Sequence, residues 1–247
     1  MKLYEDERID RLVSADLDII QSQTVFSYSL DALLLAHCAN ISHRDDKVVV
    51  DFCSGNGAVT LLLAAKTKSP VTGVEIQPRL VDMARRSAKL NGLEERLQFI
   101  EADITKLNGE IEFDSVDFLT CNPPYFLGEV TGKVNQNEHY AIARHELYLP
   151  FATLCEQASR LLKFKGKFYL VHRPDRILEI FDELRKYQLS PKRVQFVYTK
   201  NEKEATIVLI EAIKNGSEHG MKFLPPLVVY DEDGNYSTDV KKIIYGE

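Results

Sequence analysis

Four consecutive residues near the middle of the chain, Asn122-Pro123-Pro124-Tyr125, combine groups that can position a planar amine. The Asn122 amide oxygen can accept one N–H of such an amine, and the Pro123 carbonyl can accept the other. Neither proline has an N–H and each ring fixes φ, so the turn is rigid and its carbonyl is held in place. Tyr125 offers a flat ring on which a heterocycle can stack.

A planar amine of this kind is a poor nucleophile because its lone pair is delocalised, as in adenine N6 or a side-chain amide. Two acceptors on its N–H bonds would turn the lone pair out of conjugation and toward an electrophile. Catalysis would then rest on positioning and electrostatic complementarity, with no general base needed before transfer. We therefore expect Asn122, Pro123, Pro124 and Tyr125 to be catalytic, with Tyr125 also binding a flipped base. A plain strand-ending turn is the alternative.

A glycine-containing turn precedes a predicted helix at positions 51–57, Asp-Phe-Cys-Ser-Gly-Asn-Gly. Gly55 and Gly57 allow the backbone to pass close to a ligand and to adopt positive φ. Dinucleotide enzymes hold a pyrophosphate on such a turn, but Thr60 stands at the third glycine position of their pattern. Asp51 suits a ligand that carries an ammonium group better than one that carries phosphates.

Acidic side chains also follow the next two predicted strands. Glu75 ends the second strand, where an acid can accept hydrogen bonds from both ribose hydroxyls of an adenosine. Asp103 follows the third strand and can accept a hydrogen bond from the adenine amine, with Ile76 and Ile104 on either side of the ring. The carboxyl ends of parallel strands meet at one edge of a sheet, so the ordered set predicts an adenosine-containing ligand there.

Strand and helix patterns alternate from position 47 onward. Apolar and β-branched runs predict strands at 48–50, 71–75, 97–100, 115–120, 167–171, 194–198 and 205–210. Helices are predicted at 58–66, 78–91, 149–162 and 175–187. Repeated alternation of this kind gives a parallel sheet with helices on both faces. The short polar link at 199–203 predicts that the last two strands form an antiparallel hairpin.

Two flanking segments complete the chain. Residues 27–38 predict an apolar helix with Ser27 or Ser29 at its start. The segment after Gly216 is rich in Pro, Gly, Asp and Tyr, and we expect an irregular tail packed on the domain. The predicted parts are therefore an N-terminal extension whose helix covers the ligand site (1–45), a sheet domain (46–215) and a C-terminal tail (216–247).

Composition bounds the class of protein. The 247 residues are 45% apolar and 28% charged, which fits one globular α/β domain. No apolar run approaches the ~20 residues that span a bilayer, and the acidic N-terminus does not resemble a signal peptide, so we expect a cytoplasmic protein with no membrane partner. The four cysteines form no Cys-x-x-Cys pair, and no metal site is predicted. A net charge of −6 argues mildly against a general nucleic-acid coat but permits a local basic patch.

Together these residues resemble the S-adenosylmethionine motifs of class I methyltransferases, with Cys53 in place of the first glycine of Asp-x-Gly-x-Gly-x-Gly. The resemblance implies a Rossmann-like α/β fold with a seven-stranded, mostly parallel sheet, one antiparallel strand and helices on both faces. It also implies S-adenosyl-L-methionine as the cofactor. The cofactor-binding residues expected on this basis are Phe26, Ser27, Asp31, Asp51, Cys53, Gly55, Gly57, Glu75, Ile76, Asp103, Ile104 and Asn122.

Within this class, the chain is most similar to the tRNA adenine-N6 methyltransferases that modify the adenosine 3′ of a valine tRNA anticodon. The similarity extends to segments 26–35 before the sheet, 144–146 after the catalytic loop and 235–237 in the tail. It implies N6-adenine methylation with tRNA as the nucleic-acid partner, and Arg144 and His145 as substrate-binding residues. The oligomeric state is not predicted.

Other functions share some of these features. Glutamine-N5 protein methyltransferases use the same Asn-Pro-Pro-Tyr, since a side-chain amide poses the same chemical problem. Other RNA or DNA amino-group methyltransferases are further alternatives, and a non-enzymatic adenosine-binding module would not need the motif. For an RNA substrate, a phosphate-binding patch could form from basic residues that would otherwise be a solvated surface. These candidates are Lys163, Lys165, Lys167, Arg173 and Arg176.

Overall fold

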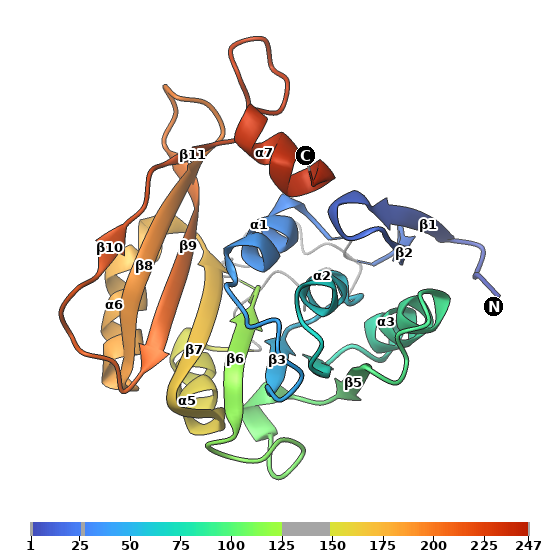
Figure 1. Ribbon diagram of the computed structural model, residues 1–247, viewed down its shortest axis with the longest axis horizontal. Coiled ribbons are helices and arrows are strands. Elements are labelled where there is room, and N and C mark those ends of the chain that lie inside the picture. Colours follow the sequence, from blue (N-terminus) through green and yellow to red (C-terminus); the bar gives the residue numbers. More distant parts are fainter. Residues whose placement is uncertain (1, 26–27, 125–148, 247) are drawn as a thin grey trace, which may run out of the picture.

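The computed structural model describes residues 2–25, 28–124 and 149–246, and at its centre lies a sheet with helices on both faces (Figure 1). Its seven longer strands lie in the order β5-β4-β3-β6-β7-β9-β8. All run parallel except β9, which is antiparallel to both of its neighbours. Their bounds are β3 (Val49–Phe52), β4 (Val71–Glu75), β5 (Leu97–Glu101), β6 (Val116–Cys121), β7 (Leu162–His172), β8 (Leu189–Tyr198) and β9 (Ala205–Lys214).

The sheet extends beyond the seven strands expected from the sequence. The two-residue strands β10 (Lys222–Phe223) and β11 (Leu227–Val228) pair with β8, which makes nine strands in the described part of the chain. They belong to the segment after Gly216, which therefore is not irregular throughout and ends in helix α7 (Thr238–Tyr245). Pairing along β8 satisfies backbone groups that an edge strand would otherwise expose.

Two hydrophobic clusters lie on opposite faces of this sheet. Side chains alternate between the faces of a strand, and accordingly Val49 belongs to one cluster and Val50 to the other. Helices α1 (Leu30–Cys38), α2 (Ala58–Lys66) and α3 (Pro78–Leu90) cover the first face. Helices α5 (Phe151–Leu161) and α6 (Ile177–Lys186) cover part of the second face.

No helix among the described residues is long and apolar enough to cross a membrane.

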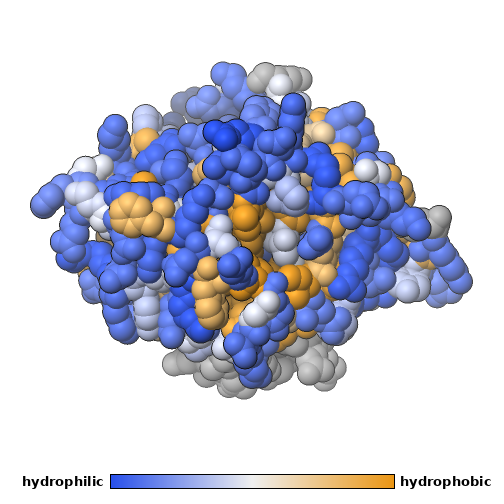
Figure 2. Space-filling model, turned by 60° about the horizontal axis from the view of Figure 1, so that its bottom comes forward, coloured by the Kyte–Doolittle hydropathy of each residue, from blue (hydrophilic) through white to orange (hydrophobic). Residues whose placement is uncertain are grey.

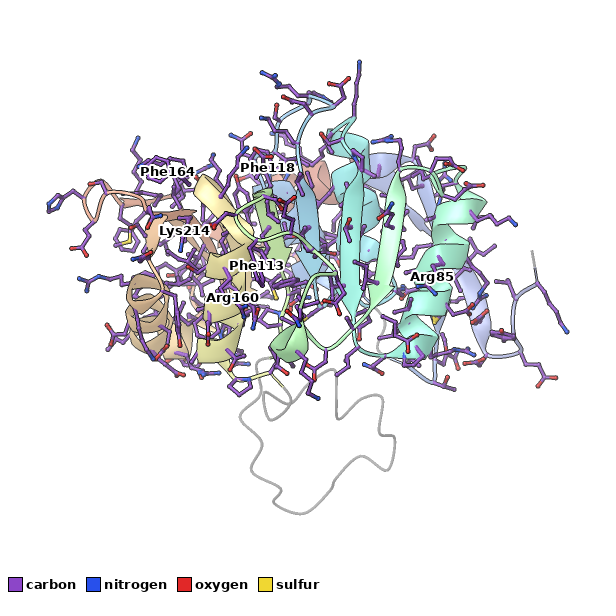
Figure 3. All side chains as sticks on the ribbon, turned by 90° about the horizontal axis from the view of Figure 1, so that it is seen from below. Arg85, Phe113, Phe118, Arg160, Phe164 and Lys214 are labelled. Atoms are coloured by element: carbon purple, nitrogen blue, oxygen red, sulfur yellow. The ribbon has the colours of Figure 1, made fainter. Side chains whose placement is uncertain are left out.

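On the second face, no helix among the described residues covers β4 and β5 (Figure 3). The connection from β5 to β6 contains only the short 3-10 helix η2 (Ile104–Lys106); η1 (Val13–Ala15) and η4 (Pro174–Arg176) are similar short turns elsewhere. The Arg160 guanidinium at the end of α5 lies 4.4 Å from the centre of the Phe113 ring in this connection. The same side of the molecule shows apolar side chains gathered in a hollow near its middle (Figure 2).

A crevice is expected beside β3, because the chain leaves this strand in opposite directions. It first forms β4 and β5 on one side and then returns to place β6 on the other. The connections at the carboxyl ends of β3 and β6 therefore diverge, and open α/β sheets bind ligands at such a switch point. The turn after β3 and the motif that begins at Asn122 after β6 are thereby adjacent.

The polar N-terminus forms an antiparallel hairpin of β1 (Glu7–Leu12) and β2 (Leu17–Ser22), a segment in which the sequence pattern predicts no strands. The hairpin packs against α3. The Glu7 carboxylate is fully buried, 2.6 Å from Arg86 and 3.0 Å from Arg79. Both guanidinium groups lie 4.8 Å from the centre of the Tyr4 ring. Ion pairs on β1 and apolar packing of Ile20 on β2 against Leu80 and Met83 of α3 therefore dock this segment together.

Replacing Arg86 with Ala should lower the free energy of unfolding by about 1–3 kcal/mol, because buried Glu7 loses its nearest partner. Denaturant titration followed by circular dichroism measures the change. The matched control is Arg185→Ala, which removes the exposed ion pair between Arg185 and Glu218, 3.7 Å apart. It should lower the free energy of unfolding by less than about 0.5 kcal/mol. Equal effects of the two substitutions would contradict the docking role of Arg86.

Candidate functional site

A pocket opens at the carboxyl ends of β3, β4, β5 and β6, at the crevice that the strand order predicts. Segments from all four strand ends and from α1 contribute to its wall. The lining residues are Tyr28, Ala32, Cys53, Ser54, Gly55, Asn56, Ala58, Val59, Glu75, Ile76, Gln77, Leu80, Ala102, Asp103, Ile104, Asn122, Pro124 and Leu149. Eight of the residues predicted for the site are among them: Cys53, Gly55, Glu75, Ile76, Asp103, Ile104, Asn122 and Pro124.

The Glu75 carboxylate is buried at the end of β4 and is held by two backbone amides. Its Oε2 accepts a hydrogen bond from the Gly55 N–H at 3.0 Å, and its Oε1 accepts one from the Gln77 N–H at 3.0 Å. Burial raises the pKa of Glu75, and these two hydrogen bonds oppose that shift. The carboxylate therefore lies in a fixed orientation on the pocket wall, with lone pairs left for a ligand.

The turn between β3 and α2 approaches the pocket in a left-handed backbone conformation. Cys53, Gly55 and Gly57 have φ values of 54°, 56° and 88°. Cys53 thus keeps the conformation that glycine favours, at a cost of about 1–2 kcal/mol. At Gly57, a Cβ atom would lie 3.1 Å from the Phe99 ring and from the Ala84 methyl group, so a larger residue would crowd the packing beneath the turn. Gly57 does not line the pocket but starts α2.

Asp51 lies behind this turn rather than on the pocket wall. Its two oxygens accept hydrogen bonds from the hydroxyls of Thr60 at 2.8 Å and Thr120 at 2.7 Å. Burial raises the pKa of Asp51 to about 7, against the effect of these hydrogen bonds. Asp51 therefore ties β3 to α2 and β6, and its contact with an ammonium group of a ligand stays a prediction.

Asp103 starts the short helix η2 and faces the pocket beside two isoleucines. Its Oδ1 accepts hydrogen bonds from the Thr105 N–H and hydroxyl, and its Oδ2 lies 2.9 Å from the Lys106 ammonium. Burial raises the pKa of Asp103, but these partners outweigh it and hold the pKa below its usual range. Asp103 is therefore a charged acceptor, while exposed Ile76 and buried Ile104 give the same wall apolar surface.

Asn122 and Pro124 bring the predicted catalytic motif to the pocket. Both are half-buried and line it, whereas Pro123 is buried and does not. Cys121 pairs with Phe52 in the register of β6 and β3, which places Asn122 next to the turn at Cys53. Asp31, in the first turn of α1, is half-buried and is not part of the lining. The predicted residues Phe26, Ser27, Tyr125, Arg144 and His145 lie outside the described residues.

Several lining residues were not predicted from the sequence. Tyr28 enters from the N-terminal segment, and Leu149 from the start of the segment before α5. Ser54 and Asn56 lie between predicted residues and Gln77 follows one, so their places in the two turns could have revealed them. The Ser54 hydroxyl is buried in the described part of the chain with no hydrogen-bond partner, so a ligand atom could satisfy it.

The basic residues considered for a phosphate patch do not form one surface. Lys167 lies on β7 and Arg173 directly follows the last residue of this strand, so six residues at about 3.3 Å each separate them by roughly 20 Å. Lys163 lies at the opposite end of β7, before an irregularity in its register. Lys163 pairs with Asp117 at the amino ends of the strands, and Lys167 lies 3.4 Å from Glu211. Arg173 and Arg176 lie near the pocket edge of the sheet, where they pair with Asp175 and Glu179, respectively. Lys163 and Arg173 are close in sequence, which gave no sign that they lie at opposite ends of β7.

The electrostatic character of the pocket follows from its lining. Glu75 and Asp103 are acidic, and none of the described residues that line the pocket is Lys, Arg or His. An acidic lining suits a ligand with hydroxyls, amines or a positive charge, and it disfavours a pyrophosphate. The geometry therefore accommodates an adenosine with a cationic substituent better than it accommodates a dinucleotide.

Curated proteins similar to this chain include the tRNA1(Val) (adenine(37)-N6)-methyltransferase of Shewanella amazonensis, which is 34% identical over 146 residues. That match covers 58% of this chain and 59% of the Shewanella protein, less than two thirds of its length. The protein of the same name from Porphyromonas gingivalis strain W83 is 27% identical over 232 residues, which are 92% of this chain and 90% of that protein.

A solved structure with the same fold is that of a predicted O-methyltransferase, protein Atu636 from Agrobacterium tumefaciens. It superposes with a TM-score of 0.69 at 23% sequence identity and covers 87% of this chain and 96% of that chain. The family described as a methyltransferase domain matches residues 43–216, more than half of the chain. The resemblance to class I methyltransferases is thus confirmed, and the chain belongs to the methyltransferase domain family.

Proposed function

We propose that this protein transfers a methyl group from S-adenosyl-L-methionine to the N6 amine of an adenine in tRNA. The observation that carries the proposal is the meeting of Glu75, Asp103 and Asn122 in one pocket, from the ends of three strands. The first two residues match the needs of an adenosine, and the third matches those of a planar amine. The names of the relatives above support tRNA as the substrate.

The residues of the pocket fit S-adenosylmethionine, which would supply a methyl group activated by a sulfonium. Glu75 would accept hydrogen bonds from the two ribose hydroxyls, because its carboxylate is already oriented by Gly55 and Gln77. Asp103 would accept from the adenine amine, with Ile76 and Ile104 against the ring. The Ser54 hydroxyl, which lacks a partner among the described residues, would gain one. Acidic surroundings favour a cationic ligand.

Asn122 would act on the target base rather than on the cofactor alone. Its amide oxygen would accept one N6–H and the Pro123 carbonyl the other, which aligns the lone pair with the methyl group. Pro124 shapes the pocket wall beside them. Tyr125 would stack on the base, and Arg144 and His145 would contact the RNA; these three roles stay predictions. The enzyme would thereby lower the barrier by orientation.

The substrate class is tested by methyl transfer from a labelled donor to total tRNA, to protein and to duplex DNA. We expect label in tRNA, and nuclease digestion should release it as N6-methyladenosine. Label confined to protein as N5-methylglutamine would overturn the tRNA assignment while leaving the catalytic motif in place. Binding of the donor without transfer to any of these substrates would favour an adenosine-binding module.

Asn122→Ala should retain cofactor affinity within about twofold and lower the single-turnover rate by roughly 100-fold, because the lost interaction forms fully only in the transition state. The rate is measured at saturating tRNA and cofactor. Gln98→Ala, at an exposed position on β5, is the matched loss of an amide and should react as the parent does. If Asn122→Ala reacts as fast as Gln98→Ala, the motif is a structural turn.

A further inference from the structure

Strand β2 of the N-terminal hairpin is hydrogen-bonded to the turn that forms the pocket. Asn56, 3% exposed, donates through Nδ2 to the Ile20 carbonyl at 2.9 Å. The same Nδ2 lies 3.4 Å from Oε1 of Gln21. Asn56 also lines the pocket, between Gly55 and the start of α2. The hairpin, which lies outside the family match at 43–216, therefore reaches the pocket wall.

Gln21 is the residue through which three segments meet. Its side chain is 4% exposed, and its Oε1 accepts a hydrogen bond from the Tyr28 N–H at 3.2 Å. Its Nε2 donates to Oδ2 of Asp10 on β1 at 3.1 Å. One buried amide thus contacts β1, the Asn56 side chain and the backbone of Tyr28, whose residue lines the pocket.

Asp10 determines which way the Gln21 amide points. An ionised carboxylate only accepts hydrogen bonds, so it selects the NH2 group of Gln21 and leaves the oxygen for Tyr28 and Asn56. Both of those partners are donors, and they require the same orientation. Asp10, Tyr28 and Asn56 therefore all favour the same orientation of the Gln21 amide. Replacing the donor group of Gln21 with an acceptor would break its hydrogen bond with Asp10.

Contacts other than this amide also dock the hairpin on α3, among them the apolar packing of Ile20 on Leu80 and Met83. Ion pairs of Glu7 with Arg79 and Arg86, and the contacts of both guanidinium groups with the Tyr4 ring, join the start of the hairpin to α3. Gln21 lies instead on the side that faces the pocket turn. The ion pairs of Glu7 thus stabilise the docked hairpin, whereas the hydrogen bond from Tyr28 to Gln21 holds Tyr28 at the pocket.

We propose that Gln21 is a positioning residue for the methyl donor, because its side chain is hydrogen-bonded to Tyr28 and to Asn56, which both line the cofactor pocket. The inference rests on the proposed function only in that the ligand is S-adenosylmethionine. Loss of these hydrogen bonds should weaken cofactor binding and leave the rate of methyl transfer at saturating cofactor unchanged, since Gln21 does not line the pocket.

The test exchanges the amide and the carboxylate between positions 21 and 10. Gln21→Glu places two carboxylates together and should raise the Kd for S-adenosylhomocysteine, measured by calorimetry, about tenfold. Asp10→Asn alone leaves an acceptor for the Gln21 amide and should stay within about twofold of the parent. In the double variant, the amide at position 10 can donate to the carboxylate at position 21, so the Kd should return to within about threefold of the parent.

Arg86→Ala is the control for a merely structural effect, because it weakens hairpin docking without touching Gln21. It should lower the melting temperature while leaving the Kd within about twofold of the parent. Parent-like binding by Gln21→Glu, or a folded double variant that binds as weakly as Gln21→Glu, would overturn the positioning role. A parent protein that does not bind S-adenosylhomocysteine would instead overturn the methyl-donor assignment, and the positioning role with it.

Discussion

The carboxylate of Glu75 accepts hydrogen bonds from the backbone of two different turns, Gly55 after β3 and Gln77 after β4. A buried carboxylate is costly unless such donors satisfy it, so the position of Glu75 and the path of both turns are determined together. The positive φ of Gly55 is part of this arrangement. A group that binds ribose hydroxyls is therefore fixed before any ligand arrives, which reduces the ordering that binding requires.

A second buried acid extends this rigidity toward the catalytic motif. Asp51 receives hydrogen bonds from Thr60 on α2 and Thr120 on β6, two residues before Asn122. The cofactor turn and the proposed catalytic loop thus begin from the same hydrogen-bonded unit. Because the proposed chemistry relies on orientation, small displacements between these two segments would matter more than loss of any general base.

Much of the fold could be predicted from the sequence because alternating strand and helix patterns carry most of it. Helix Ala58–Lys66 and strand Val71–Glu75 have the bounds expected, and the hairpin of β8 and β9 is antiparallel as expected. The two short strands β10 and β11 carry no periodicity that a sequence could reveal. The hairpin of β1 and β2 was missed because the buried residues of β2 are consecutive rather than alternating, and because ion pairs supply part of its docking.

The site was predictable where residue type and place along the chain coincide, as at Glu75 and Asp103. It was not predictable where contacts join distant segments. Tyr28 lines the pocket, and Gln21 contacts it from behind, because the N-terminal hairpin folds back on the turn at Asn56. Conversely, Lys163 and Arg173 are near in sequence but lie at opposite ends of β7. Strand geometry and tertiary docking decide both outcomes.

The most direct test of the central claim, that Glu75 binds the ribose of the methyl donor, combines a change in the ligand with a change in the protein. Calorimetry would compare S-adenosylhomocysteine with its 2′-deoxy analogue on the parent and on a Glu75→Ala variant shown by circular dichroism to be folded. The parent should bind the deoxy ligand about tenfold more weakly, whereas the affinities of the variant for the two ligands should differ less than about twofold. Equal binding of both ligands by the parent, or equal discrimination by both proteins, would contradict that claim.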